Sequence, residues 1–467
     1  MGRTAQANQA KSLPLAFVAG AIGAQVVLAG LALVLHIELF VLAAAMGLAA
    51  VAAMVRFPLV WLSCFALSLV PFFLLQGPKI EVEEATLVGV LLVAVLLWLF
   101  WQSMVVRRRL VEHWGDVLIL LFVGLSVLNL PIALLNDVPL EEWMRRWLPM
   151  WLLLYYFPVR TYVRTPRQLL LLLSLLLLSG VFIALAILER YRSGVAVAEY
   201  AYQLRGGYAR SQSEHFFAFA IVSCVVGAAF VRGLKWRLFL LSCAIVMGAA
   251  VLVTFSRTAW MSVLIGLGVA WVLLTWRQRL QTALVGGVLL AVALGSLAMA
   301  FPQISSVLIR LVGQRFTSIG QGQQDLALRG RFYQLERALQ EVTHYPLGGQ
   351  GLGKEFPYYE AGARRHIHYG YIHNSYLATA YRYGIPMALL LVAALVAHFR
   401  HVLRQVRRAP PTSLWRMAAV TGVAGMVGVM LSLMMTENPL DMRITTMVLT
   451  WVLVLANVRY PSNADGS

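Results

Sequence analysis

Apolar runs of about 20 residues recur along the chain, and this feature constrains the fold more than any other. A helix of that length crosses the hydrocarbon core of a bilayer, which is about 30 Å thick. The chain is 60% hydrophobic and only 12% charged, whereas soluble domains carry about 25% charged residues. The sequence therefore predicts an all-α polytopic membrane protein.

We predict about fourteen transmembrane helices, or twelve if the short, closely spaced first spans include an interfacial hairpin. The first run lacks a clear small-residue cleavage site, so we interpret it as a retained helix rather than a signal peptide. The predicted spans are roughly 14–35, 37–55, 57–76, 85–105, 115–135, 147–163, 168–188, 215–232, 236–255, 258–276, 280–301, 385–399, 416–434 and 444–459.

The formal net charge of +18 would suggest nucleic-acid binding in a soluble protein. With the N-terminus in the cytoplasm, nearly all of this excess falls on inside loops such as 107–109 and 400–408. Outside loops such as 81–84 and 141–142 are acidic. This alternation is typical of the positive-inside orientation. We therefore expect both termini in the cytoplasm, anionic membrane lipids as the partner of the basic loops, and no nucleic acid.

Two outer connections, 189–214 and 302–384, are longer than the rest, and long connections are usually functional. We predict that residues 1–301 hold eleven spans with an outer loop at 189–214. Residues 302–384 would form a large, mostly helical catalytic loop region, and residues 385–467 the last three spans and a cytoplasmic tail.

Within the large polar region, residues 330–339 have helical periodicity. Phe332, Leu335, Ala338 and Leu339 share one face, and the helix should end before Pro346. Such a helix would either lie on the outer leaflet or pack on the bundle, and the sequence leaves both open.

The stretch 348–354 resembles a phosphate-binding loop, but Glu355 stands where Ser or Thr is required and no strand precedes it. We interpret it as a flexible glycine turn whose backbone amides could face an anion. His366 and His368 alternate as on a strand or loop. No Asp or Cys nearby completes a metal site with them or with His373, so we predict no metal there.

His373 lies in the same polar region and is a candidate proton acceptor, because imidazole has an unperturbed pKa of about 6.5. Arginines are the candidate anion ligands, since the planar guanidinium binds phosphate oxygens bidentately. Arg257 lies at a tight outer turn between two spans, and the alternative there is snorkelling to the interface. The other candidates are Arg205, Arg210, Arg329 and Arg331, for which the alternative is solvated loop charge.

Together these residues resemble the O-antigen ligase superfamily, which also contains O-antigen polymerases and protein O-oligosaccharyltransferases. The resemblance covers roughly the last two thirds of the chain. It rests on the 205–212 loop, Ser256-Arg257, Gly330-Arg331, the stretch 346–353, and His373-Asn374-Ser375-Tyr376-Leu377 followed by Gly384. It implies a multi-pass protein of a Gram-negative inner membrane, with periplasmic outer loops, a periplasmic active site and no cofactor.

The resemblance implies transfer of a polysaccharide from undecaprenyl diphosphate to the lipid A-core oligosaccharide. His373 would be the general base and Arg257 would stabilise the leaving diphosphate. The implied substrate-binding residues are Arg205, Arg210, Arg329, Arg331, Asn374 and Tyr376. Because diphosphate is already a good leaving group, we expect a metal-independent, inverting displacement.

Two alternatives remain within the superfamily. A polymerase would use a second lipid-linked glycan as acceptor, and an oligosaccharyltransferase would use a protein. The single large outer region favours the ligase. A transporter or flippase is the alternative from a different class, and it should carry ionisable residues in the middle of its spans. The mid-span segments here are nearly free of charge.

Overall fold

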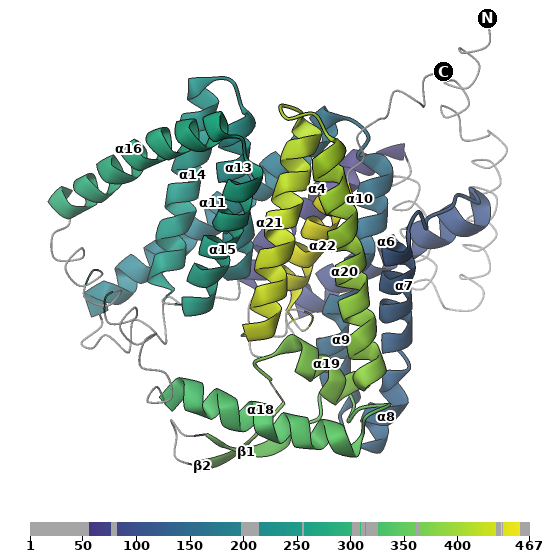
Figure 1. Ribbon diagram of the computed structural model, residues 1–467. Helices are drawn as coiled ribbons and strands as arrows, with labels where there is room; N and C mark the ends of the chain where they lie inside the picture. Colours follow the sequence, from purple (N-terminus) through teal and green to yellow (C-terminus); the bar gives the residue numbers. More distant parts are fainter. Residues whose placement is uncertain are drawn as a thin grey trace, which may run out of the picture.

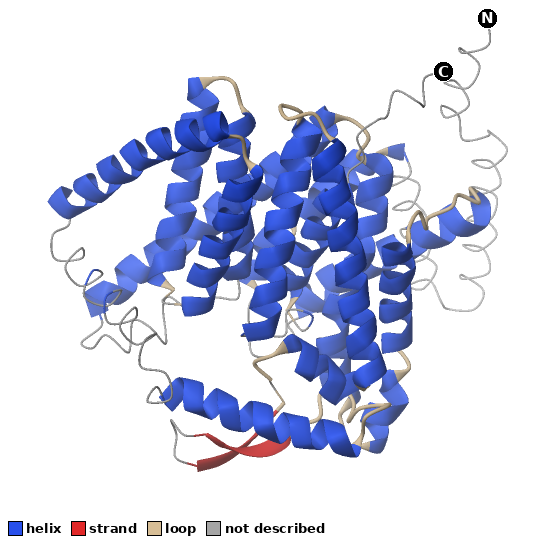
Figure 2. Ribbon diagram, in the orientation of Figure 1, coloured by secondary structure: helices blue, strands red, loops and turns tan. Residues whose placement is uncertain are grey.

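The protein is built almost entirely of helices, arranged as a bundle with a smaller layer across one end (Figures 1 and 2). The computed structural model describes residues 56–75, 82–197, 214–254, 256–300, 309, 313, 326–360, 365–370, 372–435, 440 and 442–457. In this part of the chain the predicted helical membrane architecture is confirmed. A two-stranded antiparallel sheet is the exception to it.

The elements of the bundle follow one another as α4 (Pro58–Leu67), α5 (Leu69–Leu74), α6 (Val82–Phe100), a π-helix (Trp101–Val105), α7 (Trp114–Ser126), α8 (Asn129–Leu135), α9 (Leu140–Trp147), a 3-10 helix (Leu148–Tyr155), α10 (Tyr156–Tyr162), α11 (Pro166–Val197), α13 (Glu214–Phe230), α14 (Leu234–Val253), α15 (Arg257–Leu273), α16 (Trp276–Ala300), α20 (Ile385–Arg408), α21 (Leu414–Met435) and α22 (Arg443–Asn457). The layer across the end contains α18 (Leu326–His344), β1 (Phe356–Glu360), β2 (Arg365–Tyr369) and α19 (Ser375–Tyr383).

Six described helices are long and apolar enough to cross a membrane. Five shorter apolar helices, Pro58–Leu74, His215–Phe230, Arg257–Leu273, Leu414–Gly428 and Arg443–Asn457, accompany them. The predicted spans 14–35 and 37–55 lie outside the described residues, so the total of fourteen stays a prediction. Helix α11 continues to Val197, within the segment 189–214 that the sequence assigns to an outer loop. An ion pair between Arg192 and Glu189 (2.9 Å) lies on this extension.

The predicted span 147–163 is not one regular α-helix. It forms a 3-10 helix followed by the short helix α10. Pro149 and Pro158 lie within this segment, and proline removes a backbone donor and clashes with the preceding turn. A 3-10 helix of 8 residues is long for its type. Tight packing holds it, because Tyr155, Tyr156 and Phe157 are fully buried.

Helix α22 lies at the centre of the bundle, and all of its residues from Ile444 to Asn457 are buried. It packs closely against α21 at Gly422, where a Cβ atom would lie 2.9 Å from the backbone nitrogen of Ala456. Small residues permit such close helix contacts in membrane proteins. Helix α16 behaves oppositely and extends away from the bundle with Leu284 and Val288 exposed (Figure 1).

The layer formed by α18, the β1–β2 hairpin and α19 crosses one end of the bundle, which we call the island end (Figures 1 and 2). The strands pair antiparallel, with Phe356 opposite Tyr369 and Glu360 opposite Arg365. The alternation of His366 and His368 thus does correspond to a strand. An aromatic contact joins β1 to α19, since the ring centroids of Phe356 and Tyr381 are 5.2 Å apart.

Helix α18 confirms the predicted helix in the polar region, and it ends at His344, before Pro346. The predicted apolar face is only partly correct. Ala338 is fully buried, but Phe332 and Leu339 are 59% and 57% exposed. The reason is that α18 packs on α19 and β1, and the side turned inward carries Gln334, Ala338 and Val342. Spacing of four residues places these three on one helix face.

Candidate functional site

His373 lies at the island end, directly before the first turn of α19. The next residue, Asn374, has extended backbone angles and caps the helix, because its side-chain oxygen accepts a hydrogen bond from the backbone N–H of Leu377 at 2.9 Å. This capping role fixes the chain direction at residue 373. The His373 side chain is half-buried, so it is anchored without being sealed from the surface.

Gln334 of α18 holds the His373 ring. The Gln334 side-chain oxygen lies 2.6 Å from ring Nδ1 and accepts from the His373 backbone N–H at 3.0 Å. Gln334 itself is 1% exposed. Nothing in the sequence pattern singled out this glutamine, which is one polar residue on a helix that carries several.

Tyr376 is the second residue of α19 and connects this helix to the bundle. Its hydroxyl donates to the backbone oxygen of Met430 in α21 at 3.3 Å. Burial raises the pKa of Tyr376 to about 12, well above its ordinary value near 10. Tyr376 therefore keeps its phenolic proton throughout the neutral range and acts as a hydrogen-bond donor there.

Arg257 is the first residue of α15, whose early turns lie beside the end of α21 that Tyr376 contacts: Gly428 of α21 lies beside Ser262 of α15, and Met430 accepts from Tyr376. Ser256 caps this helix, with its hydroxyl oxygen 3.5 Å from the backbone nitrogen of Ala259. Helix α21 packs against both α15, which begins at Arg257, and α19, which follows His373. The N-terminus of a helix has positive partial charge, which adds to the charge of an arginine placed there.

The other predicted arginines are distributed differently. Arg329 and Arg331 lie on α18, five and three residues before Gln334. The Arg329 side chain donates to the Tyr333 hydroxyl at 3.2 Å, and its guanidinium lies 5.8 Å from the centre of that ring. Arg205 and Arg210 fall outside the described residues. The structure thus places Arg329, Arg331, Asn374 and Tyr376 in the same layer as His373.

The glycine-rich loop 348–353 is a structural clamp, which corrects the expectation that its amides face an anion. Four successive backbone N–H groups, those of residues 349 to 352, donate to Tyr345 O, Tyr381 O, Arg382 O and Asn129 Oδ1 at 2.6–3.1 Å. Lys354 also turns inward, where its ammonium donates to Asn136 O at 2.8 Å. These donors are already used within the protein.

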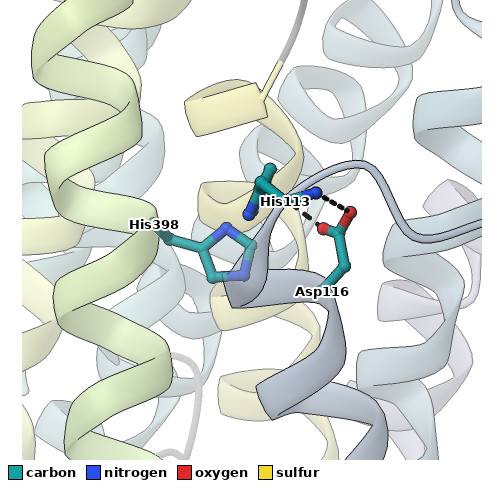
Figure 3. Close-up of side chains that lie close together, drawn as sticks. All are labelled: His113, Asp116 and His398. Atoms are coloured by element: carbon teal, nitrogen blue, oxygen red, sulfur yellow. Dashed lines mark hydrogen bonds and ion pairs between the residues drawn. The ribbon is translucent and has the colours of Figure 1, made fainter.

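The sequence analysis did not find a second polar cluster, which His113, Asp116 and His398 form (Figure 3). Potential ligand atoms of His113, Asp116 and His398 lie within 4.8 Å of one another. Position 398 is thirteen residues past the start of α20 at 385, or roughly 20 Å along a helix. The cluster is therefore remote from His373.

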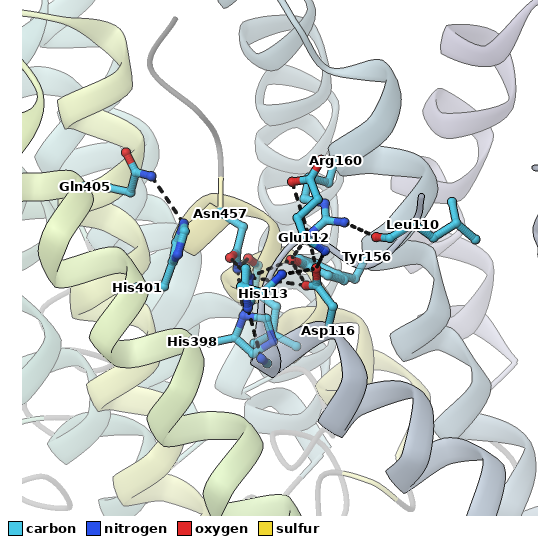
Figure 4. A network of polar contacts seen from close by, with 12 residues as sticks. Leu110, Glu112, His113, Asp116, Tyr156, Arg160, His398, His401, Gln405 and Asn457 are labelled. Carbon is cyan, nitrogen blue, oxygen red and sulfur yellow. Dashed lines mark hydrogen bonds and ion pairs between the residues drawn. The ribbon is translucent and has the colours of Figure 1, made fainter. Parts of the chain in front are cut away.

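Asp116 is fully buried and its carboxylate is saturated with donors (Figure 4). Oδ2 accepts from Arg160 at 2.7 Å and from the backbone N–H groups of Glu112 and His113 at 2.7 and 3.2 Å. Oδ1 accepts from the Tyr156 hydroxyl at 2.8 Å. Arg160 thus provides the counter-charge for a carboxylate in an apolar bundle, as a buried charge requires.

Asn457 joins the two histidines of this cluster (Figure 4). Its oxygen accepts from His113 Nε2 at 2.6 Å, and its NH₂ group donates to His398 Nδ1 at 2.8 Å. His113 Nδ1 accepts from the Gly115 backbone N–H at 3.0 Å. A cation would have to displace Asn457 and compete with Arg160, so these groups fit a closed hydrogen-bonded network better than a metal centre.

This network contains two ionisable residues inside candidate spans, Asp116 near the start of Trp114–Leu135 and His398 in Ile385–Arg408. One signal was present in the sequence: a histidine in an apolar span is costly unless it has partners. Those partners could not be read from it, since His113 and Asn457 are 344 positions apart.

A comparison with protein-family models identifies the part of the chain that contains Arg257, Gln334 and His373. Residues 242–392 match the family described as O-antigen ligase. This region is similar to the O-antigen ligases, and the match covers about a third of the chain. The resemblance seen in the sequence is thereby confirmed. Enzymes of this superfamily are glycosyltransferase-like and act on lipid-linked glycans. No curated protein matches the chain significantly.

The matched region runs from α14 into α20 and includes the whole described part of the island end from α18 to α19. Most of the buried network lies outside the matched range, namely His113, Asp116, Tyr156, Arg160 and His398. The position of the match favours a functional site at the island end. The buried network then has a structural role elsewhere in the bundle.

Proposed function

We propose that the protein is an O-antigen ligase that transfers polysaccharide from undecaprenyl diphosphate to the lipid A-core oligosaccharide. The reaction would take place at the periplasmic face of a Gram-negative inner membrane, with both termini of the chain in the cytoplasm. The observation that supports the proposal is that α15, which begins at Arg257, lies beside the same end of α21 that Tyr376, three residues after His373, contacts, within the matched region. His373 can take a proton there, and Arg257 can bind phosphate.

The chemistry is a single displacement. His373 accepts the proton of the acceptor hydroxyl while the acceptor oxygen forms a bond to the anomeric carbon of the donor sugar. The bond between that carbon and the diphosphate oxygen breaks, and the diphosphate leaves with the electron pair. Attack from the side opposite the leaving group inverts the anomeric configuration.

The cationic groups stabilise the charge that develops on the leaving diphosphate. Arg257 is the main candidate, because it stands at a helix N-terminus, where partial positive charge favours anions. Arg205, Arg210, Arg329 and Arg331 are proposed to bind the diphosphate and the glycan. Asn374 and Tyr376 shape the acceptor side through the first turn of α19. Diphosphate is a good leaving group, so the proposed reaction is metal-independent.

The test is transfer by the purified protein from a lipid-diphosphate-linked glycan to lipid A-core, with a chelator present. His373→Ala should lower the rate by about 100-fold or more, the range for loss of a general base. His344→Ala is the matched control, because His344 is exposed at the end of α18. Wild-type transfer by His373→Ala, or loss of wild-type transfer on adding chelator, would refute the mechanism.

The acceptor decides among the members of the superfamily. A ligase produces glycan attached to lipid A-core. Elongated lipid-linked glycan would indicate a polymerase, and glycosylated protein an oligosaccharyltransferase. In cells, the His373→Ala variant should accumulate lipid-linked donor in the periplasm, whereas loss of a transporter would retain it on the cytoplasmic side.

A further inference from the structure

We propose that Gln334 is a positioning residue that fixes the tautomer and the orientation of the His373 ring, and this inference rests on the proposed function. Gln334 has no expected contact with substrate. Its effect would be exerted through His373, by keeping the ring proton on Nδ1 and the lone pair on Nε2.

The hydrogen bonds determine which atom of the Gln334 amide faces His373. The backbone N–H of His373 can only donate, so the amide atom 3.0 Å from it must be the oxygen. The same oxygen lies 2.6 Å from ring Nδ1. An amide oxygen carries no proton, and therefore Nδ1 must be the donor. In the neutral ring the lone pair is then on Nε2.

The surroundings of Gln334 hold it in this position. Its side chain is 1% exposed, and Ala338, one turn later, is fully buried. Glu341, two turns later, accepts from the Gln350 side chain at 2.9 Å. Gln350 in turn donates its backbone N–H to Tyr381 O at 2.7 Å. Helix α18 is therefore tied at two points to the segment that carries His373, which limits both sliding and rotation.

The chemistry of an amide suits this role. When Nε2 takes a proton from the acceptor hydroxyl, the Nδ1–H of the resulting imidazolium still donates to the Gln334 oxygen. No rearrangement of the pair is needed during the step. A carboxylate at the same place would do the same and would also stabilise the imidazolium by its charge. This difference between amide and carboxylate makes the proposal testable.

Three variants separate positioning from general stability. Gln334→Leu removes the acceptor at similar size, and it should lower kcat about 10- to 100-fold, the range for losing the partner that orients a metal-ligating histidine. KM for donor and acceptor should change little. Gln334→Glu keeps the acceptor, so it should retain activity and shift the acidic limb of the kcat/KM pH profile to higher pH. Gln340→Leu, at an exposed position on the same helix, should match wild type.

The outcomes are distinct from those for the proposed function. If His373→Ala is inactive but Gln334→Leu has wild-type kcat, the positioning role is wrong and the base assignment stands. If Gln334→Glu shows no shift of the acidic limb, the positioning role is likewise wrong. Transfer by His373→Ala would refute the proposed function itself. Gln334→Glu keeps the size and the acceptor oxygen, so it decides the matter even where Gln334→Leu does not fold.

Discussion

Asn129 donates its side-chain amide to the backbone carbonyl oxygen of Arg382 at 2.7 Å, although the two residues are 253 positions apart. The oxygen of the same amide accepts from the backbone N–H of Leu352 at 2.6 Å. One buried side chain thus joins α8 of the bundle to the glycine-rich loop and to the C-terminal end of α19. The layer that carries His373 is therefore fastened to the bundle by hydrogen bonds between a side chain of α8 and the backbone of the loop and of α19.

Gly349→Ala should loosen this attachment. Gly349 has φ of +69°, and a Cβ atom there would lie 2.5 Å from the carbonyl oxygen of Arg382. Strain and collision together should lower the free energy of unfolding by at least about 2 kcal/mol. Thermal unfolding in detergent measures the change, and transfer activity should fall with it.

The control for this substitution is Gly89→Ala, since a Cβ atom at Gly89 would meet nothing within 4 Å. Alanine also favours a helix more than glycine does, so this control should be neutral or slightly stabilising. Equal stability of the two variants would show that the loop is not a clamp.

Asp116→Ala should destabilise the bundle by about 3–5 kcal/mol, because it leaves the Arg160 side chain buried without its counter-charge. The Arg160 side chain is only 7% exposed. Replacing both residues, Asp116→Ala with Arg160→Leu, should recover part of this loss. Thermal unfolding of the single and double variants gives the coupling between them, with the exposed Glu336→Ala as control.

The same variant also separates support from catalysis. The buried network is remote from His373, so folded Asp116→Ala protein should keep its activity per molecule. Loss of transfer by Asp116→Ala protein that is still folded at the assay temperature would instead place Asp116 in the catalytic path.

Tyr376→Phe should remove one hydrogen bond and leave the pH profile of transfer unchanged below pH 10. Burial raises the pKa of Tyr376 from about 10 to about 12, so the folded state favours the protonated phenol. The resulting stability is fully present below pH 10 and is lost as the pH rises towards 12. The variant should lack this alkaline loss in unfolding experiments. A new limb near neutral pH would contradict the assignment.

Cysteine labelling tests the orientation of the bundle. Leu347→Cys, at a position 79% exposed at the island end, should react with a membrane-impermeant maleimide added outside spheroplasts. Thr412→Cys, exposed in the turn between α20 and α21, should react only after permeabilisation. The native cysteines would be replaced in both. The reverse labelling pattern would overturn the proposed periplasmic site.

The sequence predicted the elements better than their contacts. Hydropathy located the apolar helices that the structure describes, and Pro346 correctly ended α18. The irregular 3-10 helix before Tyr156 was missed, because proline-containing apolar runs have the same hydropathy as regular helices. The apolar face of α18 was only partly right, since Phe332 follows the helical period but points away from α19 and β1.

Local chemistry was sufficient to identify His373 and Arg257 as candidates, because a polar region among apolar spans is visible in the chain itself. Length and hydrophobicity alone determined that the chain is a helical membrane protein, since a run of apolar residues must satisfy its backbone within the helix. The tertiary structure decided which partners those residues meet. Gln334 and His373, like Asn129 and Arg382, are joined by directional hydrogen bonds, and these depend on how separate helices pack against one another.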